Sequence, residues 1–456
     1  MKQVILFLAC SLLGGCMLGP AYKRPDIALP AEQANKQLRV FTTSNWWRVF
    51  EDPVLDALEQ QALAYNQDLR AAMARVDEAR ADVNLARADQ MPSLSASVQS
   101  GRQGDKSGSG QSISQAGVSV SFELDLWGKY RRLSQAARAR LLASEAARDT
   151  VRLTLTADVA NQYFTLRMLD KQLEILQRTL QAREENVRIY TARYKAGYCT
   201  EVDLRRVQAD KENVQAQMQQ LSLQREQTET ALSVLLGQSP QEMITRSIPR
   251  GKTLNEFNLV PDVPVDLPSD LLQRRPDVQE AEEQLIAANA DIRAARAAYF
   301  PDISLTGVAG FASSALSSLF TGGAGVWNIA GEALAPIFEG GKIRAQNKKA
   351  EAAYREQLAV YTKTVQTAFQ EAYDALVANR LDRDIFNSYL AQTQAMQRSY
   401  ELTKKQEDAG LIGVTDLLDV EENLLSAEMN LATARKNELS AVVNLCKALG
   451  GGWKAS

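Results

Sequence analysis

The most restrictive feature of this sequence is the length of its helical patterns. A segment rich in Ala, Arg and Glu runs from about Tyr130 to Lys195. As one continuous helix it would reach roughly 100 Å at about 1.5 Å per residue, which is too long for a compact domain. A second helical pattern runs from about Asp52 to Gln90. We therefore expect an extended helical architecture, although the 23% share of charged residues is typical of soluble globular proteins.

Apolar residues recur in the longest segment at spacings of three and four, which is the pattern of a coiled-coil seam with one position skipped. The series comprises Leu166, Leu169, Leu173, Leu176, Leu180, Val187, Tyr190 and Tyr194. A similar series near the C-terminus comprises Leu417, Val420, Leu424, Ala427 and Leu431. We interpret both series as packing surfaces between helices, and not as ligand sites.

The sequence also contains an internal repeat, which predicts two similar halves. Three motif pairs recur at one constant spacing: Ala196-Gly197 and Ala409-Gly410, Asp203-Leu204 and Asp416-Leu417, and Leu236-Gly237 and Leu449-Gly450. Met91-Pro92 and Phe300-Pro301 recur at a slightly smaller spacing. The predicted organisation is a first repeat at 52–237, a Pro-rich linker at 238–268, a second repeat at 269–450 and a tail at 451–456.

Each half is expected to interrupt its helices with a pair of strands, at about 93–126 and about 302–337. In the first pair, apolar and polar residues alternate over a segment near the nine to eleven residues of a transmembrane β-strand. The apolar positions are Val118, Val120, Phe122, Leu124 and Leu126, and the polar positions are Ser119, Ser121, Glu123 and Asp125. Alternation also suits a soluble sandwich, but four such segments beside very long helices favour a membrane barrel. Glu123 and Asp125 would then face the barrel lumen.

A membrane sheet must close, because lipid cannot satisfy the backbone groups of an open sheet edge. Four strands from one chain are too few to close alone. Two copies would give eight strands, whose interior side chains fill, whereas three copies would give twelve strands around an open lumen. The predicted fold class is therefore a mixed α and β membrane protein with a trimeric twelve-stranded transmembrane β-barrel.

The first residues predict secretion and lipid attachment. Lys2, an apolar run from Val4 to Leu13 and two glycines form a signal peptide at 1–15 that ends before Cys16. This placement matches a lipobox, whose cysteine is acylated, and two acyl chains suffice for stable membrane anchoring. Met17 stands where Asp would retain a lipoprotein in the inner membrane, which favours the outer membrane. The alternative is an ordinary signal peptide with an incidental cysteine; residues 16–51 are expected to form an extended tether.

Composition argues against catalysis. The chain has no histidine, the commonest general base and transition-metal ligand. After the signal peptide and Cys16, the remaining thiols, Cys199 and Cys446, form no CxxC motif. We expect no enzyme activity, no metal and no cofactor besides the lipid on Cys16. A glycan-processing enzyme is disfavoured because no carboxylates are paired, and a net charge of −3 gives no footprint for nucleic acid.

Several motifs, in order along nearly the whole chain, resemble those of the outer-membrane factor (TolC-like) family and especially its lipoprotein branch. They are Cys16 with Gly19-Pro20, Tyr22-Lys23-Arg24-Pro25, Trp46-Trp47 ahead of Phe50, Phe122 to Lys129, Arg274-Arg275-Pro276-Asp277-Val278, and Ala448 to Trp453. The resemblance implies that the barrel continues into a long periplasmic α-helical coiled-coil barrel, with an equatorial collar formed by the linker and terminal segments. It also implies a homotrimer that passively receives small toxic compounds from an inner-membrane pump of the resistance-nodulation-division (RND) type through a periplasmic adaptor.

The turns at Gly197 and Gly410 separate long helical patterns and are predicted to form the periplasmic tips. Each glycine is expected to cap a helix. By the resemblance, the tips contact the adaptor, and Asp416 and Asp419 form acidic rings that constrict the entrance and select cations. Asp203 and Asp416 are also expected simply as first-turn acids, which the dipole of the following helix stabilises.

Asp203 matches a family acid that helps latch the tip. The arginine that the family places opposite this acid is replaced here by Ile412, so this ion pair cannot form. Two alternatives to the efflux duct remain: the exit duct of a type I protein secretion system, and a non-conducting lipoprotein strut across the periplasm. The alternating strands disfavour the strut, which has no use for them.

Overall fold

The computed structural model describes residues 22–26, 45–104, 110–257, 274–321 and 323–451. The predicted signal peptide and lipid site at Cys16 lie outside the described residues. So do most of the tether at 16–51, the last part of the linker at 238–268 and residues 452–456 of the tail.

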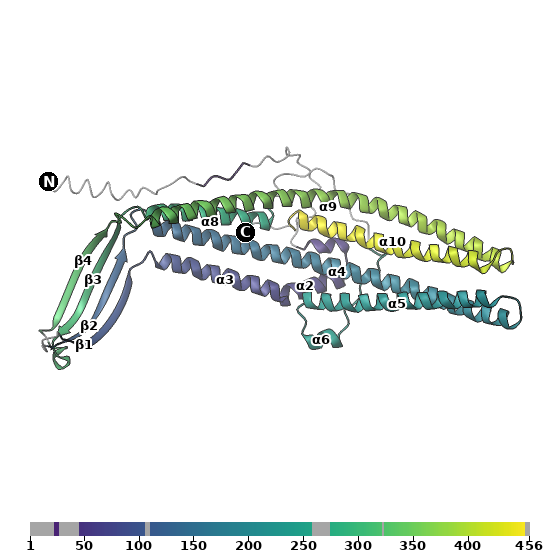
Figure 1. The fold of residues 1–456 in the computed structure, drawn as a ribbon, viewed down its shortest axis with the longest axis horizontal. Coiled ribbons are helices and arrows are strands. Elements are labelled where there is room, and N and C mark those ends of the chain that lie inside the picture. The colour runs from purple at the N-terminus through teal and green to yellow at the C-terminus, as the bar shows by residue number, and fades with distance from the viewer. Residues whose placement is uncertain (1–21, 27–44, 105–109, 258–273, 322, 452–456) are drawn as a thin grey trace. The chain divides into compact units, whose positions relative to one another are not determined.

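Most of the described residues are helical (Figure 1). The elements in chain order are η2 (Trp46–Phe50), α2 (Pro53–Tyr65), α3 (Gln67–Ala88), β1 (Ser93–Gly104), β2 (Gly110–Glu123), α4 (Lys129–Lys195), α5 (Glu201–Leu235), α6 (Pro240–Thr245), α8 (Pro276–Ala297), β3 (Asp302–Ser313), η3 (Leu316–Ser318), β4 (Gly325–Leu334), α9 (Lys342–Asp408) and α10 (Val414–Ala448). Equivalent helices have equal lengths: 22 residues for α3 and α8, 67 for α4 and α9, and 35 for α5 and α10.

The chain divides into two compact units. Unit 1 comprises Met1–Ala28, Met73–Ala147 and Gln279–Thr364, and it holds the four strands with the adjoining helical segments. Unit 2 comprises Leu29–Ala72, Arg148–Val278 and Val365–Ser456, and it is helical throughout its described residues apart from connecting segments.

The helical pattern expected from Asp52 to Gln90 comprises two helices, α2 and α3. The break is at Asn66, whose side chain accepts a hydrogen bond from the backbone N–H of Leu69 at 2.9 Å and so caps the start of α3. The Asn66 amide also donates to the backbone oxygen of Leu235 at the end of α5. Asn66 therefore separates α2 from α3, and its hydrogen bond to Leu235 fixes this break against the end of α5.

The four strands form one antiparallel sheet in the order β1-β2-β3-β4. Both strand pairs end earlier than the sequence predicted. Strand β2 ends at Glu123 and not near Leu126, because the Asp125 carboxylate accepts a hydrogen bond from the backbone N–H of Arg131 in the first turn of α4. Strand β4 ends at Leu334, two residues before Pro336, which has no N–H to continue the ladder.

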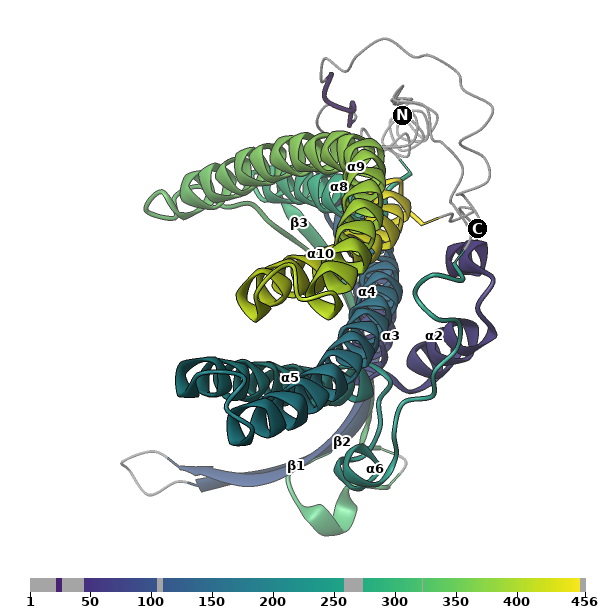
Figure 2. The same ribbon diagram turned by 90° about the vertical axis from the view of Figure 1, so that its right-hand side faces the viewer.

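The core of unit 2 is built from the predicted coiled-coil seams. Ile175 and Leu176 of α4 pack with Val214 of α5 and Leu425 of α10 in one buried cluster. Figure 2 shows the ends of α4 and α5 beside those of α9 and α10, where Tyr190 belongs to a second cluster. Of the residues predicted in the α4 seam, Leu166, Leu169, Leu173, Leu176 and Tyr190 are buried packing residues, whereas Tyr194 is 41% exposed.

No helix in the described part of the chain is long and apolar enough to cross a membrane.

Glu59 is a buried acid in the core of unit 2. It lies on α2 with 0% of its surface exposed, and neither carboxylate oxygen has a hydrogen-bond partner. Burial raises the pKa of Glu59 well above its usual value, and the nearby charge of Asp56 raises it further. The folded chain therefore favours the protonated, neutral form of this side chain.

We predict that Glu59 makes stability fall as the pH rises. Because its pKa is higher in the folded than in the unfolded chain, its stabilising contribution is fully present below the usual pKa of 4.5 and is lost as the pH rises through the raised pKa. Glu59→Gln should raise the unfolding temperature at neutral pH and make it less dependent on pH, measured by circular dichroism in detergent. Glu184→Gln on the exposed side of α4 is the control; equal pH dependence in wild type and Glu59→Gln would contradict the prediction.

Candidate functional sites in the sheet, the helix turns and the linker

The strand register gathers apolar side chains on one face of the sheet. Side chains alternate between the two faces of a strand, so residues paired across strands share a face. This apolar face carries Leu94, Ala96, Val98, Ala116, Val118, Val120, Phe122, Ile303, Leu305, Ala309, Phe311, Trp327, Ile329 and Ala333, and it gives way to Ser100, Arg102, Ser112, Ser114 and Ser313 toward the loop end of the sheet. Many of its large members, including Leu94, Trp327 and Ile329, are exposed in the single chain. An exposed apolar surface that crosses all four strands is a surface for lipid or protein.

The opposite face is mostly polar. It carries Ser93, Ser95, Ser97, Gln99, Gln115, Ser119, Ser121, Glu123, Asp302, Ser304, Thr306, Asn328 and Glu332, with Ile113, Val308, Ala312, Val326, Ala330 and Leu334 as apolar exceptions. Hydroxyl groups bridge neighbouring strands here, as between Ser95 and Ser119 at 2.7 Å. The two faces therefore differ in polarity, as expected for strands between lipid and water.

The two predicted lumen residues have different positions. Glu123 ends β2 on the polar face, where it accepts a hydrogen bond from the Tyr130 hydroxyl at 2.5 Å and lies 3.3 Å from the Lys129 ammonium. Asp125 follows the strand. Its carboxylate accepts a hydrogen bond from the backbone N–H of Arg131 and pairs with the Arg131 guanidinium. Glu123 thus remains a candidate for polar lining, whereas Asp125 joins the strand to α4.

Both predicted turns end a helix with a glycine in the left-handed conformation, φ +77° at Gly197 and +71° at Gly410. The next residue closes each turn, since the backbone N–H of Tyr198 donates to Arg193 and that of Leu411 donates to Gln406. This is the glycine C-cap that the sequence predicts.

The three predicted gate acids lie just after these turns. Asp203 forms a capping box with Thr200, and these hydrogen bonds hold the pKa of Asp203 below its usual value. Asp416 is in the first turn of α10, whose N-cap, Gly413, offers no side chain. Asp416 and Asp419 are exposed, so their carboxylates remain available to solvent in the single chain.

Polar contacts join the two turns, and the sequence did not reveal them. The Arg193 guanidinium near the end of α4 pairs with Glu407 near the end of α9 at 3.1 Å. Arg206 of α5 donates to the Thr415 hydroxyl of α10 at 3.2 Å. Side chains of all four long helices therefore connect the two turns.

A buried arginine, Arg183, links α4 to α5 and α10. Arg183 of α4 is 1% exposed and forms ion pairs with Asp210 of α5, at 3.4 Å, and with Glu421 of α10. Burial raises the pKa of Glu421, and the Arg183 charge opposes this shift. Arg183 occupies the skipped position of the α4 seam, between Leu180 and Val187, so the gap in the apolar series marked this charge.

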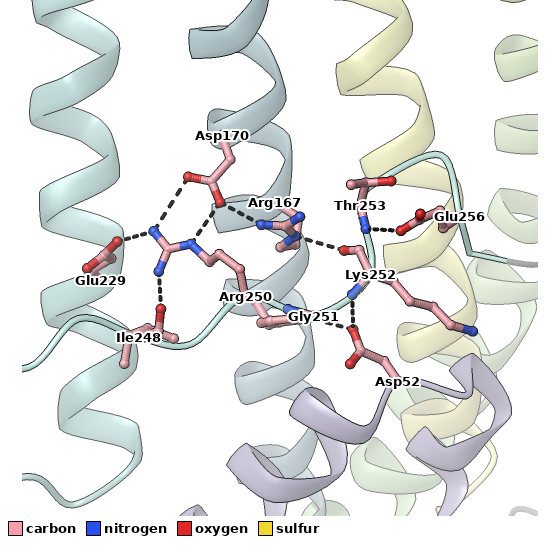
Figure 3. A network of polar contacts seen from close by, with 11 residues as sticks. Asp52, Arg167, Asp170, Glu229, Ile248, Arg250, Gly251, Lys252, Thr253 and Glu256 are labelled. Atoms are coloured by element: carbon pink, nitrogen blue, oxygen red, sulfur yellow. Dashed lines mark hydrogen bonds and ion pairs between the residues drawn. The ribbon is translucent and has the colours of Figure 1, made fainter.

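The linker is fixed to the helices of unit 2 by a network of charged groups (Figure 3). Arg250 pairs with Asp170 of α4 at 2.8 Å and with Glu229 of α5, while it also donates to the backbone oxygen of Ile248. Arg167 donates to the backbone oxygen of Lys252 at 2.9 Å. Two arginines therefore hold this segment against α4 and α5.

Asp52 connects this segment to the start of α2. Its carboxylate caps α2 and accepts hydrogen bonds from the Tyr163 hydroxyl at 2.7 Å and the Lys252 N–H at 3.2 Å. The intervening Gly251 donates its N–H to the Tyr163 hydroxyl at 3.0 Å. A Cβ at Gly251 would lie against the Asp52 carboxylate and only 2.7 Å from that hydroxyl. Only glycine fits here without displacing the network.

Within the described residues, no group of three or more His, Cys, Asp or Glu side chains is placed to hold a metal ion. The clusters found here are ion pairs and helix caps.

The sequence matches the family model of the outer membrane efflux proteins over residues 58–238 and 267–451. The chain belongs to this family, whose members are efflux channels and not enzymes, and it is an outer membrane protein. It is 35% identical to the probable efflux pump outer membrane protein TtgC of Pseudomonas putida, over 99% of this chain and 96% of that protein. It is 32% identical to the probable outer membrane lipoprotein SilC of Salmonella typhimurium, over 97% of each chain.

The fold is that of a solved channel of the same kind. The Campylobacter jejuni outer membrane channel CmeC superposes with a TM-score of 0.91 and 28% identity, over 96% of both chains. The predicted family and function are therefore confirmed: the protein is an outer membrane channel component of efflux pumps.

We predict that the Arg193–Glu407 pair helps to keep the two turns together. Glu407→Gln removes the charge that attracts Arg193, and because Arg193 is partly exposed the loss should be less than about 1 kcal/mol per chain. Channels carrying this change should open more often in a planar bilayer. Glu201→Gln is the matched control, since Glu201 pairs with Arg205 on its own helix; equal open probability in the two variants would contradict the prediction.

We predict that Gly251→Ala destabilises the linker network. The added methyl group must displace Asp52 or Tyr163, at a cost of about 1–3 kcal/mol. The unfolding temperature in detergent should fall, and protease should cut the linker faster. Gly101→Ala, where a Cβ meets no atom within 4 Å, is the control. Unchanged unfolding temperature and cleavage rate would show that the network tolerates the methyl group.

Proposed function

We propose that three copies of this chain close a twelve-stranded barrel in the outer membrane and form the exit duct of a tripartite efflux pump. The observation that carries the proposal is the sheet: four strands with one apolar face, one polar face and two edges without a partner in the described chain. Lipid would cover the apolar face, and the polar face would line an aqueous lumen. Glu123 and Glu332 would contribute carboxylates to that lining.

The number of copies follows from closure. Four strands leave two edges with unsatisfied backbone groups, which hydrocarbon does not tolerate. Eight strands would enclose a space that their own side chains fill, so a duct needs at least three copies. A homotrimer is the smallest assembly that satisfies both conditions.

The same symmetry would extend the duct through the helices. The equal lengths of α4 and α9, and of α5 and α10, support an internal two-fold repeat in which each chain contributes two equivalent helical hairpins. Three chains would then place six hairpins around one axis as a periplasmic coiled-coil barrel. The linker residues fixed by Arg250 and Asp52 would belong to an equatorial collar.

The duct would work passively. Small toxic compounds would enter it from an RND-type pump in the inner membrane through a periplasmic adaptor, and the adaptor would contact the turns at Gly197 and Gly410. The names of the relatives as efflux pump components support the pump partnership. Tyr198, Val202 and Leu411 offer exposed apolar surface at these turns for the adaptor.

Lipid on Cys16 would anchor the N-terminus to the outer membrane. The nearest described residues support a fixed tether: Arg24 forms an ion pair with Glu282 of α8, and the Tyr22 hydroxyl donates to the same carboxylate at 3.3 Å. Five residues lie between Cys16 and Tyr22, so the position of the lipid would be limited by this contact.

We expect Asp416 and Asp419 to form the selective constriction at the periplasmic entrance. Three copies would bring six carboxylates together, and such rings select for cations. Asp416→Asn combined with Asp419→Asn should lower the cation-to-anion permeability ratio several-fold and weaken block by multivalent cations. Single-channel recording of the purified trimer in a planar bilayer measures both quantities.

The matched control is Glu212→Gln combined with Glu226→Gln, which removes the same charge from the exposed side of α5 away from the turn. Selectivity that is unchanged in the Asp416 and Asp419 variant would exclude these residues as the constriction. A purified protein that remains a monomer and never conducts would refute the duct itself.

A further inference from the structure

The outer edges of β1 and β4 are oriented so that a second copy of this chain can join them. The two strands run antiparallel, because each of the three strand pairs between them is antiparallel. The start of β1 and the end of β4 therefore lie at the same end of the sheet. Edge β4 of one copy can then pair with edge β1 of the next as a further antiparallel ladder.

The seam between β2 and β3 shows how two repeats pair within one chain. β2 belongs to the first half and β3 to the second, and Val120 lies opposite Gly307 in their ladder. In a ring of three chains, β4 belongs to the second half of one copy and β1 to the first half of the next. These two strands would pair antiparallel, as β2 and β3 do. The internal seam is thus a template for the seam between copies.

Two sequence spacings transfer this register. Lys129 and Lys342 are the first residues of α4 and α9. The same offset in sequence makes Ala333 of β4 the equivalent of Val120 of β2. Ser93 and Asp302 are the first residues of β1 and β3. The same offset makes Val98 of β1 the equivalent of Gly307 of β3. The ladders agree with both spacings, because Ser93 pairs with Ser121 in the first half and Asp302 pairs with Leu334 in the second.

We infer that Ala333 of one copy lies directly opposite Val98 of the next copy, in a β4–β1 seam that repeats the register of β2 and β3. This inference rests on the proposed trimer and fixes how its chains join. It keeps the apolar face continuous, because Ala333 and Val98 both belong to that face. A slip by one residue would place apolar side chains of one copy beside polar side chains of the next.

The residues where strands meet helices support the same seam. Within the chain, Trp127 after β2 stacks on Phe300 before β3, with ring centroids 4.8 Å apart, and donates to the backbone oxygen of Pro301 at 2.7 Å. The equivalent of Phe300 at the outer seam is Met91, which is 67% exposed, and the equivalent of Trp127 is Gly340, which offers no ring.

Phe338 supplies the missing ring. It lies two residues before Gly340 and is 88% exposed. In the inferred register its ring lies near Met91 of the neighbouring copy, where a thioether and an aromatic ring attract each other. Each exposed side chain would thus be covered by the other copy.

Paired cysteines test the register in the full-length chain. Val98→Cys and Ala333→Cys are introduced together in a Cys199→Ser background and oxidised in isolated membranes. Directly opposed residues on antiparallel strands have Cα atoms about 4.5–5.5 Å apart, within the range of a disulfide. Disulfide-linked dimers and trimers should replace most of the monomer on a non-reducing gel.

Gln99→Cys with Ala333→Cys is the matched control, because Gln99 lies on the opposite face of β1. It should leave mostly monomer. A native trimer without cross-links at 98 and 333, or with equal cross-linking in the control, would overturn the register while the proposed duct stands. Loss of the trimer from wild-type preparations would overturn both.

Discussion

The two outer edges of the four-stranded sheet are the constraint on which the rest of the assembly depends. β1 and β4 each have a partner on one side only within the described chain. A membrane offers no hydrogen bonds to the free side, so in the proposed barrel each edge has to pair with another copy. In the proposed trimer, a second and third copy would pair with both edges, and the polar face would give the enclosure an aqueous interior.

Outside the sheet, charged side chains hold segments that are far apart in sequence. Asp52 joins the start of α2 to Tyr163 and to the linker, and Arg250 joins the linker to α4 and α5. Arg183 does the same for α4, α5 and α10 in the buried seam. Breaking one partner of such a group leaves an uncompensated buried charge, so these contacts define the arrangement of helices even where their net stabilisation is small.

Local patterns allowed the sequence to predict much of this fold. The alternating residues identified the strands, and Gly197 and Gly410 identified the turns, because each signal depends on neighbouring residues alone. Asp125 was placed in the strand because the alternation continues past Glu123, whereas its carboxylate holds the next helix. The Arg193–Glu407 pair was missed because its members are separated by more than two hundred residues, and nothing near Arg193 indicates its partner.

The linker network also holds α4 at one point along its length. Arg250 holds this helix at Asp170, and α4 continues to Lys195 before it turns. That remaining length is a lever of roughly 40 Å, so a tilt of about 5° at the held point would displace the turn by about 3 Å. Since the turn carries α5 along with α4, such a tilt of the two helices would separate Arg206 of α5 from Thr415 of α10, which are 3.2 Å apart, but it would also have to break the ion pair between Arg183 and Glu421.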